Sequence, residues 1–441
     1  MRIYKHINNN KDNILVKGVA STIIKLAGAF FSYALTYLIA IKYGAEGNGV
    51  FAIFLTYTLI LSTFFYMGMD FFLIKKVSVL VNQSHFKDVK NLYLIISKSY
   101  ILPVSVFLLI IGFFLKGIFD QKIIFIISLA IVLNVFIDIN SAIFRGMKKA
   151  EWFSFFSQCS KYFFAVLLFL IPFSINNKDE ILYLYLISLL LNALLSFLII
   201  TNIFNKKIPQ SKPLSNYKIS IFSIIKSSKE FFFSSIIIIS LVWMDFILID
   251  YFLDEKQAGI YSVALKLATL ISFGFTAFNA FLAPKISEIY NQNNIKKLQR
   301  ILTQNFILVF PMIIFPFIGI LFFSKDLMLL FGSEFESGWL VLILLSLGYL
   351  INGIFGPVSL LLQMTDYQKL FQNILIITLG LKLILSLILV KRWGLEGIAL
   401  ASFIGLGFWT VIGSYFVYKK MGIYSWFTPN EFKSIFTQIF K

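Results

Sequence analysis

Apolar stretches long enough to cross a lipid bilayer recur from one end of the chain to the other, and they restrict the fold more than any other feature. A helix needs about 20 apolar residues to cross the roughly 30 Å hydrocarbon core of a bilayer. The sequence therefore predicts an all-α polytopic membrane protein with twelve transmembrane helices. These helices are expected at residues 14–42, 49–74, 91–115, 122–143, 151–174, 181–204, 230–253, 258–283, 301–323, 338–363, 370–391 and 396–418.

The composition agrees with a membrane protein and excludes several other classes. Of the 441 residues, 59% are hydrophobic and 52 are Phe, which is more apolar surface than a soluble domain contains. The net charge of +18 does not indicate a nucleic-acid partner, because no motif of a nucleic-acid-binding domain accompanies it. One Cys and two His allow no disulfide within the chain and no histidine metal site, so we expect neither a metal nor a cofactor.

The loops between the apolar stretches alternate in charge, and this alternation predicts the topology. Most of the 39 Lys and Arg residues fall in every second loop and at both ends of the chain. By the positive-inside rule these loops and both termini are cytoplasmic. An even number of spans agrees with that assignment. The start of the chain lacks the pattern of a cleavable signal peptide, so we expect it to be a retained first span.

The longest internal polar stretch divides the spans six and six. It contains Pro209 and Pro213, which favour an extended linker. The expected parts are an N-terminal lobe at 1–204, a cytoplasmic linker at 205–229, a C-terminal lobe at 230–420 and a cytoplasmic tail at 421–441. In the tail, Thr428, Pro429 and Glu431 form a helix-start pattern that predicts a short interfacial helix.

The two halves resemble each other weakly. "AEGNGVFAIFLTYTLI" at 45–60 and "EKQAGIYSVALKLATLI" at 255–271 both place a Gly, an apolar residue and an aromatic residue at the start of the second helix of a half, so that Gly49 matches Gly259. An even number of helices in each half implies a parallel repeat about an axis along the membrane normal. A substrate path would then lie between the lobes.

Four lysines deep in the predicted spans are candidates for substrate binding: Lys25, Lys161, Lys266 and Lys382. A lysine at the bilayer centre costs about 2.5 to 3.5 kcal/mol, so it normally faces a water-filled cavity or a partner. Each of the four belongs to a stripe of small polar residues at helical spacing. The stripes are Ser21, Lys25, Gly28, Ser32 and Thr36; Ser154, Ser157 and Lys161; Ser262, Lys266, Thr269 and Thr276; and Thr378, Lys382 and Ser386.

Three aspartates in or near the spans, Asp70, Asp138 and Asp245, are candidates for coupling transport to an ion. Asp138 and Asp245 could instead form structural bridges with lysines. The small residues of the stripes could be helix-packing faces, although packing does not explain the lysines. The lysines outnumber the aspartates, and a cavity with that balance would attract anions.

Several stretches carry a family resemblance. They are "YGAEGNGVFAIF" and "MGMD" near the second span, "AGIYSVALKLATLISFGFTAFNAFLAPKISEIYNQNNIKKLQR", "FGSEFESGWLVLILLSLGYLINGIFGPVSLLLQMTDYQK", and "WGLEGIALASFIG" before the last span. In their order and spacing the chain resembles the polysaccharide or O-antigen repeat-unit flippases of the multidrug, oligosaccharidyl-lipid and polysaccharide exporter superfamily. The similarity covers nearly the whole chain.

The resemblance implies a two-lobe protein that opens alternately to each side of the bacterial cytoplasmic membrane. Such proteins move undecaprenyl-pyrophosphate-linked oligosaccharides, precursors of O-antigen or capsule, to the outer leaflet. The implied partners are that lipid with its pyrophosphate head, membrane lipids and other polysaccharide-assembly membrane proteins. Family members place cationic residues in helices 1 and 8, which match Lys25 and Lys266 here. Coupling to protons, sodium or the membrane potential is implied, with no resident cofactor.

Three other functions remain as alternatives. A drug or cation antiporter of the same superfamily would favour an interior rich in carboxylates, the opposite of what the sequence contains. A lipid-II-type flippase would usually carry two additional C-terminal helices. A membrane enzyme that polymerises or ligates repeat units would need a large outer loop, and we find no hydrolase or nucleotide-binding motif in the chain. We therefore expect a transporter and no enzymatic activity.

Overall fold

The computed structural model describes residues 2–98, 104–105, 121–171, 179–208 and 221–426, and within these ranges the regular structure is helical. Among the described residues, seven helices are long and apolar enough to cross a membrane. Two of them, α1 (Arg2–Tyr66) and α15 (Gln368–Met421), are bent at an internal glycine; α15 contains two of the predicted spans, and α1 contains one and most of the next. The chain is an all-α, multi-pass membrane protein, as the sequence predicts.

Contacts within the chain divide it into two units, and each is described by itself. Unit 1 comprises residues 1–42 and 53–239, and unit 2 comprises residues 43–52 and 240–441. Residues 49–52, at the start of the second predicted span, therefore belong to unit 2, while the rest of that span belongs to unit 1. Of the predicted linker, residues 209–220 lie outside the described residues, as does the predicted interfacial helix after residue 426.

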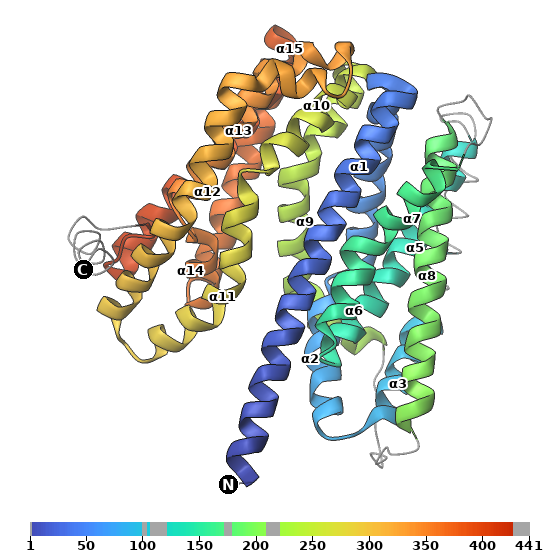
Figure 1. The fold of residues 1–441 in the computed structure, drawn as a ribbon, viewed down its shortest axis with the longest axis vertical. Coiled ribbons are helices and arrows are strands. Elements are labelled where there is room, and N and C mark those ends of the chain that lie inside the picture. The colour runs from blue at the N-terminus through green and yellow to red at the C-terminus, as the bar shows by residue number, and fades with distance from the viewer. Residues whose placement is uncertain (1, 99–103, 106–120, 172–178, 209–220, 427–441) are drawn as a thin grey trace. The chain divides into compact units, whose positions relative to one another are not determined.

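Unit 1 contains most of α1 and the helices that follow it to the first part of α9. These are α2 (Met69–Asn82), α3 (Phe86–Ile96), α5 (Gln121–Gly146), α6 (Ala150–Ser154), the π-helical η2 (Phe155–Cys159), α7 (Ser160–Phe169), α8 (Asp179–Lys207) and α9 (Ile221–Phe252). Helix α5 packs against both α2 and α8, and α7 packs along α8 (Figure 1). A buried apolar core lies between them, with Leu73, Val135 and Phe156 at its centre.

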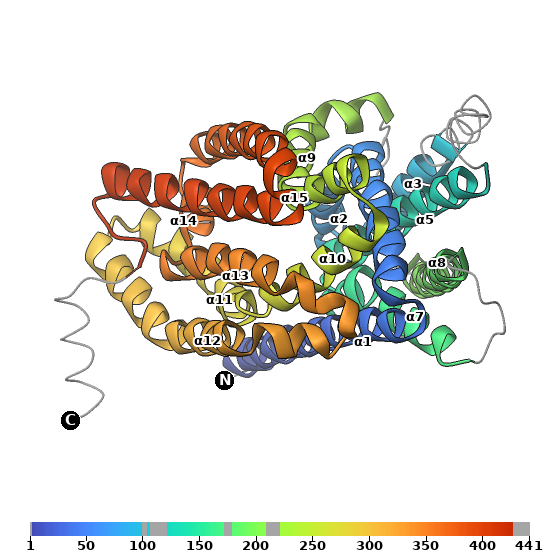
Figure 2. The ribbon, with the colours of Figure 1, turned by 90° about the horizontal axis from the view of Figure 1, so that it is seen from above.

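Unit 2 contains the helices after the middle of α9. These are α10 (Glu255–Thr269), α11 (Ser272–Asn291), α12 (Ile295–Leu329), the short η4 (Ser333–Gly338), α13 (Trp339–Ile354), α14 (Val358–Met364) and α15. Helix α13 packs against α10, α12 and α15, and α11 packs against α12 and α14. Figure 2 shows α13 lying between α12 and the paired arms of α15.

Glycines with positive φ fix the breaks that separate the predicted spans. Gly44 (φ 67°) bends α1 between the spans predicted at 14–42 and 49–74, and Gly394 (φ 51°) bends α15 between those predicted at 370–391 and 396–418. Residues with a Cβ rarely adopt this conformation. A Cβ at Gly44 would also approach Glu334 Oε2 to 2.9 Å, and this carboxylate accepts a hydrogen bond from the Ala45 N–H. These boundaries were predicted correctly.

Within the described residues, turns break three of the predicted spans. The span at 49–74 ends at Tyr66, and α2 starts anew at Met69 because Gly68 takes a left-handed conformation. The span at 258–283 is interrupted between α10 and α11, and the span at 338–363 is interrupted before Pro357. Hydrophobic length does not reveal such breaks, since a short turn inside the bilayer is as apolar as the helices around it.

The glycines that match between the halves, Gly49 and Gly259, lie against each other inside unit 2. A Cβ on Gly49 would overlap the carbonyl oxygen of Glu255, and a Cβ on Gly259 would overlap that of Ala45. The two helix starts therefore cross with their backbones in contact, as small residues permit in membrane proteins. The sequence pairs these positions by similarity, and the structure shows that they also touch.

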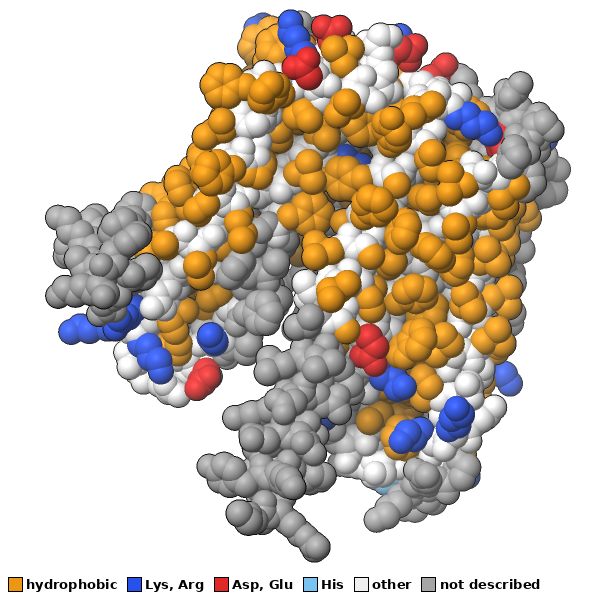
Figure 3. All heavy atoms as spheres, viewed as in Figure 1, with side chains coloured by type: hydrophobic (Ala, Val, Ile, Leu, Met, Phe, Trp, Pro, Cys, Tyr) orange, Lys and Arg blue, Asp and Glu red, His pale blue; other side chains and the backbone are white. Residues whose placement is uncertain are grey.

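The surface has the distribution expected of a protein in lipid. On the face drawn in Figure 3, hydrophobic side chains cover the long middle part of the helices, while most Lys, Arg, Asp and Glu side chains lie toward the ends. Large aromatic residues are among the most exposed, including Phe30 at 67%, Phe315 at 70% and Phe322 at 74%. Water would disfavour such exposure, whereas acyl chains accept it.

Candidate functional site

In unit 1, the Lys25 stripe lies beside α6 and η2. The hydroxyls of Ser21 and Ser154 are 2.6 Å apart, and a Cβ on Gly28 would lie 2.7 Å from the carbonyl oxygen of Gln158. Ser21, Lys25 and Gly28 follow one another at intervals of four and three residues, so they share this face of α1. Lys25 is exposed, and its ammonium forms no ion pair with any described carboxylate.

A π-helical turn interrupts the predicted fifth span directly before Lys161. The turn covers Phe155–Cys159, and its Phe156 carbonyl accepts a side-chain hydrogen bond from another helix. Asn192 on α8 donates its amide to that oxygen at 3.1 Å, and its own carbonyl oxygen accepts from the Ser160 hydroxyl at 2.7 Å. Such single-turn π segments are frequent at functional sites.

Lys161 and two of the candidate ion-coupling aspartates form one group in unit 1. Asp138 interacts electrostatically with Lys161 and with Asp70. The Tyr66 hydroxyl donates to the Asp138 backbone carbonyl at 3.3 Å. Asp70 lies in the first turn of α2, where the helix dipole favours a negative charge. Asp138 thus has one predicted lysine and one predicted aspartate as electrostatic neighbours.

In unit 2, Lys266 lies at the point where the predicted eighth span is interrupted. It is half-buried in the last turn of α10, and the next residues close short turns, with Leu270 N–H donating to Leu267 O and Ile271 N–H donating to Ala268 O. The carboxyl end of a helix carries partial negative charge, which favours an ammonium there. Interrupted helices near the middle of the membrane commonly form substrate sites in transporters.

Lys382 and Asp245 form a buried ion pair in unit 2. The Lys382 ammonium lies 2.9 Å from Asp245 Oδ2 and also donates to the Leu241 carbonyl, and the two side chains are 6% and 3% exposed. Tyr261 and Ser402 each donate a hydroxyl to the same carboxylate oxygen at 2.6 Å. One carboxylate therefore joins four helical segments, which are those of Asp245, Tyr261, Lys382 and Ser402.

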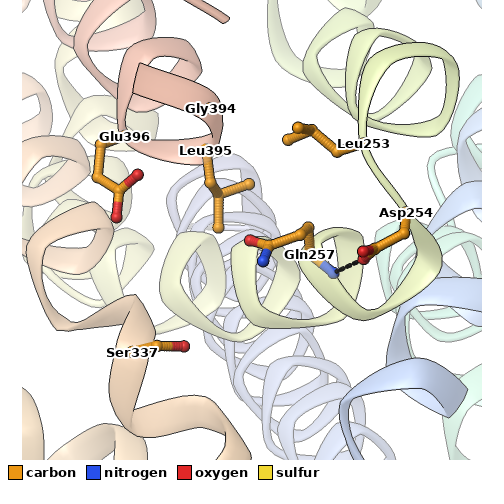
Figure 4. A pocket seen from close by; sticks show the side chains of 7 residues that line it. All are labelled: Leu253, Asp254, Gln257, Ser337, Gly394, Leu395 and Glu396. Carbon is orange, nitrogen blue, oxygen red and sulfur yellow. Dashed lines mark hydrogen bonds between the residues drawn. The ribbon is translucent and has the colours of Figure 1, made fainter. Parts of the chain in front are cut away.

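A separate pocket of about 290 Å³ opens among the turns of unit 2 (Figure 4). Its polar lining residues are Asp254, Gln257, Ser337 and Glu396. Asp254 serves as the N-cap of α10, since its carboxylate accepts from the Gln257 N–H at 2.7 Å. That bond accounts for the aspartate as a helix cap. None of the predicted site residues lines this pocket.

The comparisons with known proteins concern both sequence and fold. The model of a family described as polysaccharide biosynthesis protein matches residues 12–290, well over half of the chain. The chain belongs to this family. The match includes Lys25, Lys161 and Lys266 and ends before Lys382.

Two proteins of Haloferax volcanii are similar to this member of the polysaccharide biosynthesis family. One is described as a probable low-salt glycan biosynthesis flippase, Agl15, and is 26% identical over 214 residues, which cover 48% of this chain and 43% of that protein. The other is described as a probable flippase, AglR, and is 26% identical over 167 residues, which cover 37% of this chain and 35% of that protein. The matched part thus spans less than half of either relative.

Solved transporter structures share the fold. An inward-facing multidrug resistance MATE family transporter has a TM-score of 0.67 at 12% identity, with 91% of this chain and 98% of that one covered. The lipid II flippase MurJ in an inward closed conformation has a TM-score of 0.65 at 17% identity, with 96% and 90% covered. At these identities the likeness concerns the fold alone.

The structure separates the four predicted lysines of this family member into two kinds. Lys25 and Lys266 lie at least partly exposed on their helices, and Lys161 is half-buried with its ammonium 5.3 Å from the ring centre of Tyr162. Lys382 is the exception, because its ammonium is paired with the Asp245 carboxylate inside the protein. For Lys382 and Asp245, the geometry favours the structural bridge that the sequence left as an alternative.

The predicted spans place Arg145 in a loop, whereas the structure places it at the end of a helix in unit 1. It lies in the last turn of α5, its guanidinium is 5.0 Å from the ring centre of Phe153 on α6, and it interacts electrostatically with Lys25. Its position directly after an apolar span, followed by Gly146, is the only sequence signal that could have separated it from the loop lysines.

Proposed function

We propose that this protein is a flippase for a lipid-linked oligosaccharide. The cargo is an undecaprenyl-pyrophosphate-linked repeat unit of O-antigen or capsule, carried from the cytoplasmic to the outer leaflet of the bacterial cytoplasmic membrane. Both termini face the cytoplasm, and the protein works by opening alternately to each side. Membership of the polysaccharide biosynthesis family and the flippase descriptions of the two archaeal relatives support this proposal.

The main observation behind the proposal is that Lys25 is an exposed cation without an acidic partner among the described residues. This ammonium belongs to a membrane helix, is exposed on the face of α1 that contacts α6, and has no described carboxylate within ion-pair distance. A charge at such a depth is costly unless it serves an ion or a substrate. A pyrophosphate head supplies the missing negative charge, and lysine holds it as a point charge that permits release.

Lys161 in unit 1 and Lys266 in unit 2 are proposed as further cations that bind the head group during transport. Lys266 lies at a helix interruption, and Lys161 follows a π-helical turn, so each lies where the regular backbone pattern is broken. Lys382 is left out of the proposed substrate site because Asp245 already neutralises it. Of the candidates for coupling to protons, sodium or the membrane potential, Asp70 and Asp138 remain, since Asp245 is engaged with Lys382.

The experiment replaces the proposed cations and measures both insertion and transport. In a host whose surface glycan depends on this chain, Lys25→Ala and Lys266→Ala should abolish surface glycan while the protein still reaches the membrane at normal levels. Lys148→Ala is the matched control, because Lys148 is exposed and donates to Asn82 at 2.7 Å. The control should retain wild-type glycan.

The proposal fails if the double variant, Lys25→Ala with Lys266→Ala, still displays normal glycan. Loss of glycan together with loss of the protein from the membrane would indicate a folding defect, so Lys25→Arg and Lys266→Arg are made in parallel. These variants keep the charge and should retain transport. If the wild-type chain exports a cationic drug and moves no lipid-linked glycan, it is an antiporter and the proposal is refuted.

A further inference from the structure

We propose that Arg145 and Lys25 together form a two-cation site for the diphosphate of the lipid head at the end of unit 1 that receives the substrate. This inference rests on the proposed function and adds a residue that the family resemblance and the sequence did not assign. By the positive-inside rule, the turn after Arg145 faces the cytoplasm, so the site would be the first to meet the cargo.

The side chain of Arg145 lies along a membrane helix. Its guanidinium lies 5.0 Å from the ring centre of Phe153 on α6, the residue directly before Ser154. A cation over an aromatic face is held in place by the negative charge of the ring face. An arginine that only sets the membrane topology needs no such contact, because its charge has the same effect on topology at any position in the loop.

Lys25 lies on the face of α1 that contacts this part of α6. The contact between Ser21 and Ser154 sets the two helices side by side, and Lys25 lies one turn further along the same face of α1. Arg145 lies over Phe153, the neighbour of Ser154, so both cations border the same segment of α6, where two like charges repel each other. A dianionic ligand between them would relieve that repulsion.

No acid in the described residues cancels this pair of charges. Asp138 on α5 interacts with Lys161 and Asp70. Glu151 on α6 has one carboxylate oxygen buried without a hydrogen-bond partner, and it forms no ion pair with Lys25 or Arg145. Arg145 and Lys25 are both exposed, so a ligand can reach them.

The two side chains suit a diphosphate better than a monophosphate. A guanidinium binds phosphate oxygens through two parallel N–H donors, whereas an ammonium is a compact charge. One phosphoryl group would occupy the guanidinium and the other the ammonium. A lipid monophosphate would satisfy only one of the two.

The test measures ligand binding to the purified full-length chain in nanodiscs of zwitterionic lipid. The probes are farnesyl diphosphate, farnesyl monophosphate and inorganic pyrophosphate. Because a charge-assisted bidentate contact is lost, Arg145→Gln should bind farnesyl diphosphate about tenfold more weakly than wild type, and Arg145→Lys should lose about threefold. Lys25→Gln should resemble Arg145→Gln. Lys148→Gln, three residues from the pair's arginine in the same turn region, should stay within about twofold.

The preference for diphosphate over monophosphate should fall in Arg145→Gln, a result that a merely structural role would not give. Wild-type affinity of Arg145→Gln and Arg145→Lys for farnesyl diphosphate, with binding lost in Lys25→Gln, would overturn the role of Arg145 and leave the proposed function intact. Equal affinity of wild type for inorganic pyrophosphate and farnesyl diphosphate would overturn the assignment to a lipid head. If the proposed function itself is wrong, the wild-type chain would bind neither farnesyl probe, and this result differs from the two results above.

Discussion

Lys25 in unit 1 and Lys382 in unit 2 have nearly the same sequence surroundings and opposite structural surroundings. Each lies in an apolar helix within a stripe of small polar residues. Lys25 is exposed and has a second cation, Arg145, as its electrostatic neighbour. Lys382 is 5% exposed and donates to Asp245. A lysine in a membrane helix is therefore a substrate candidate only after its partner is known.

The largest expected effect comes from breaking the pair in unit 2. Lys382→Met should lower the free energy of unfolding by about 3 to 5 kcal/mol, because Asp245 would be left as a buried charge without its partner. The double variant Lys382→Met with Asp245→Leu should recover most of that loss. Unfolding titrations in detergent micelles measure both.

The same double variant also separates a structural role from a substrate role. If it folds and displays surface glycan, the pair is structural, as the geometry favours. If it folds with wild-type stability and displays none, Lys382 belongs with Lys25 after all, and the contrast between the units disappears.

A smaller effect is expected from the hydroxyl that supports Asp245. Tyr261→Phe removes a hydrogen bond of 2.6 Å to a buried carboxylate, and such bonds contribute about 1.5 to 3 kcal/mol. In the Lys382→Met and Asp245→Leu background the same change should cost much less, since the acceptor is gone. Equal costs in both backgrounds would show that Tyr261 acts through packing alone.

Unit 1 has a neutral counterpart to this network at its π-helical turn. Asn192→Ala leaves the Phe156 carbonyl and the Ser160 hydroxyl without their partner, so we expect a loss of about 1 to 3 kcal/mol. Asn202→Ala on the same helix is exposed and should change stability by less than about 0.5 kcal/mol. The comparison would be weakened if the two variants unfolded at the same denaturant concentration.

The smallest effect on stability is expected at Lys25 itself. Lys25→Gln should leave the free energy of unfolding within about 0.5 kcal/mol of wild type, because the side chain is exposed and forms no ion pair with a described residue. Transport should nevertheless be lost. A strong destabilisation would instead mean that Lys25, like Lys382, serves the fold.

Some breaks between helices were predicted correctly and others were missed, and this difference has a physical reason. Hydrophobic length located the break at Gly44, because polar residues flank it, as they do at Gly394. It missed the break at Gly68 and the one between α10 and α11, where the turn residues themselves are not polar. A turn inside lipid is stabilised by neighbouring helices, and these contacts leave no local pattern.

The sequence by itself determined the class of fold, the family resemblance and the list of lysines that needed an explanation. Apolar length, loop charge and helical spacing are local properties, so they can be obtained from neighbouring residues. The partners of those lysines were decided only by the tertiary structure. Asp245 and Lys382 are 137 residues apart, and Arg145 lies on a different helix from Lys25, so no local pattern could show which lysine is paired with a carboxylate.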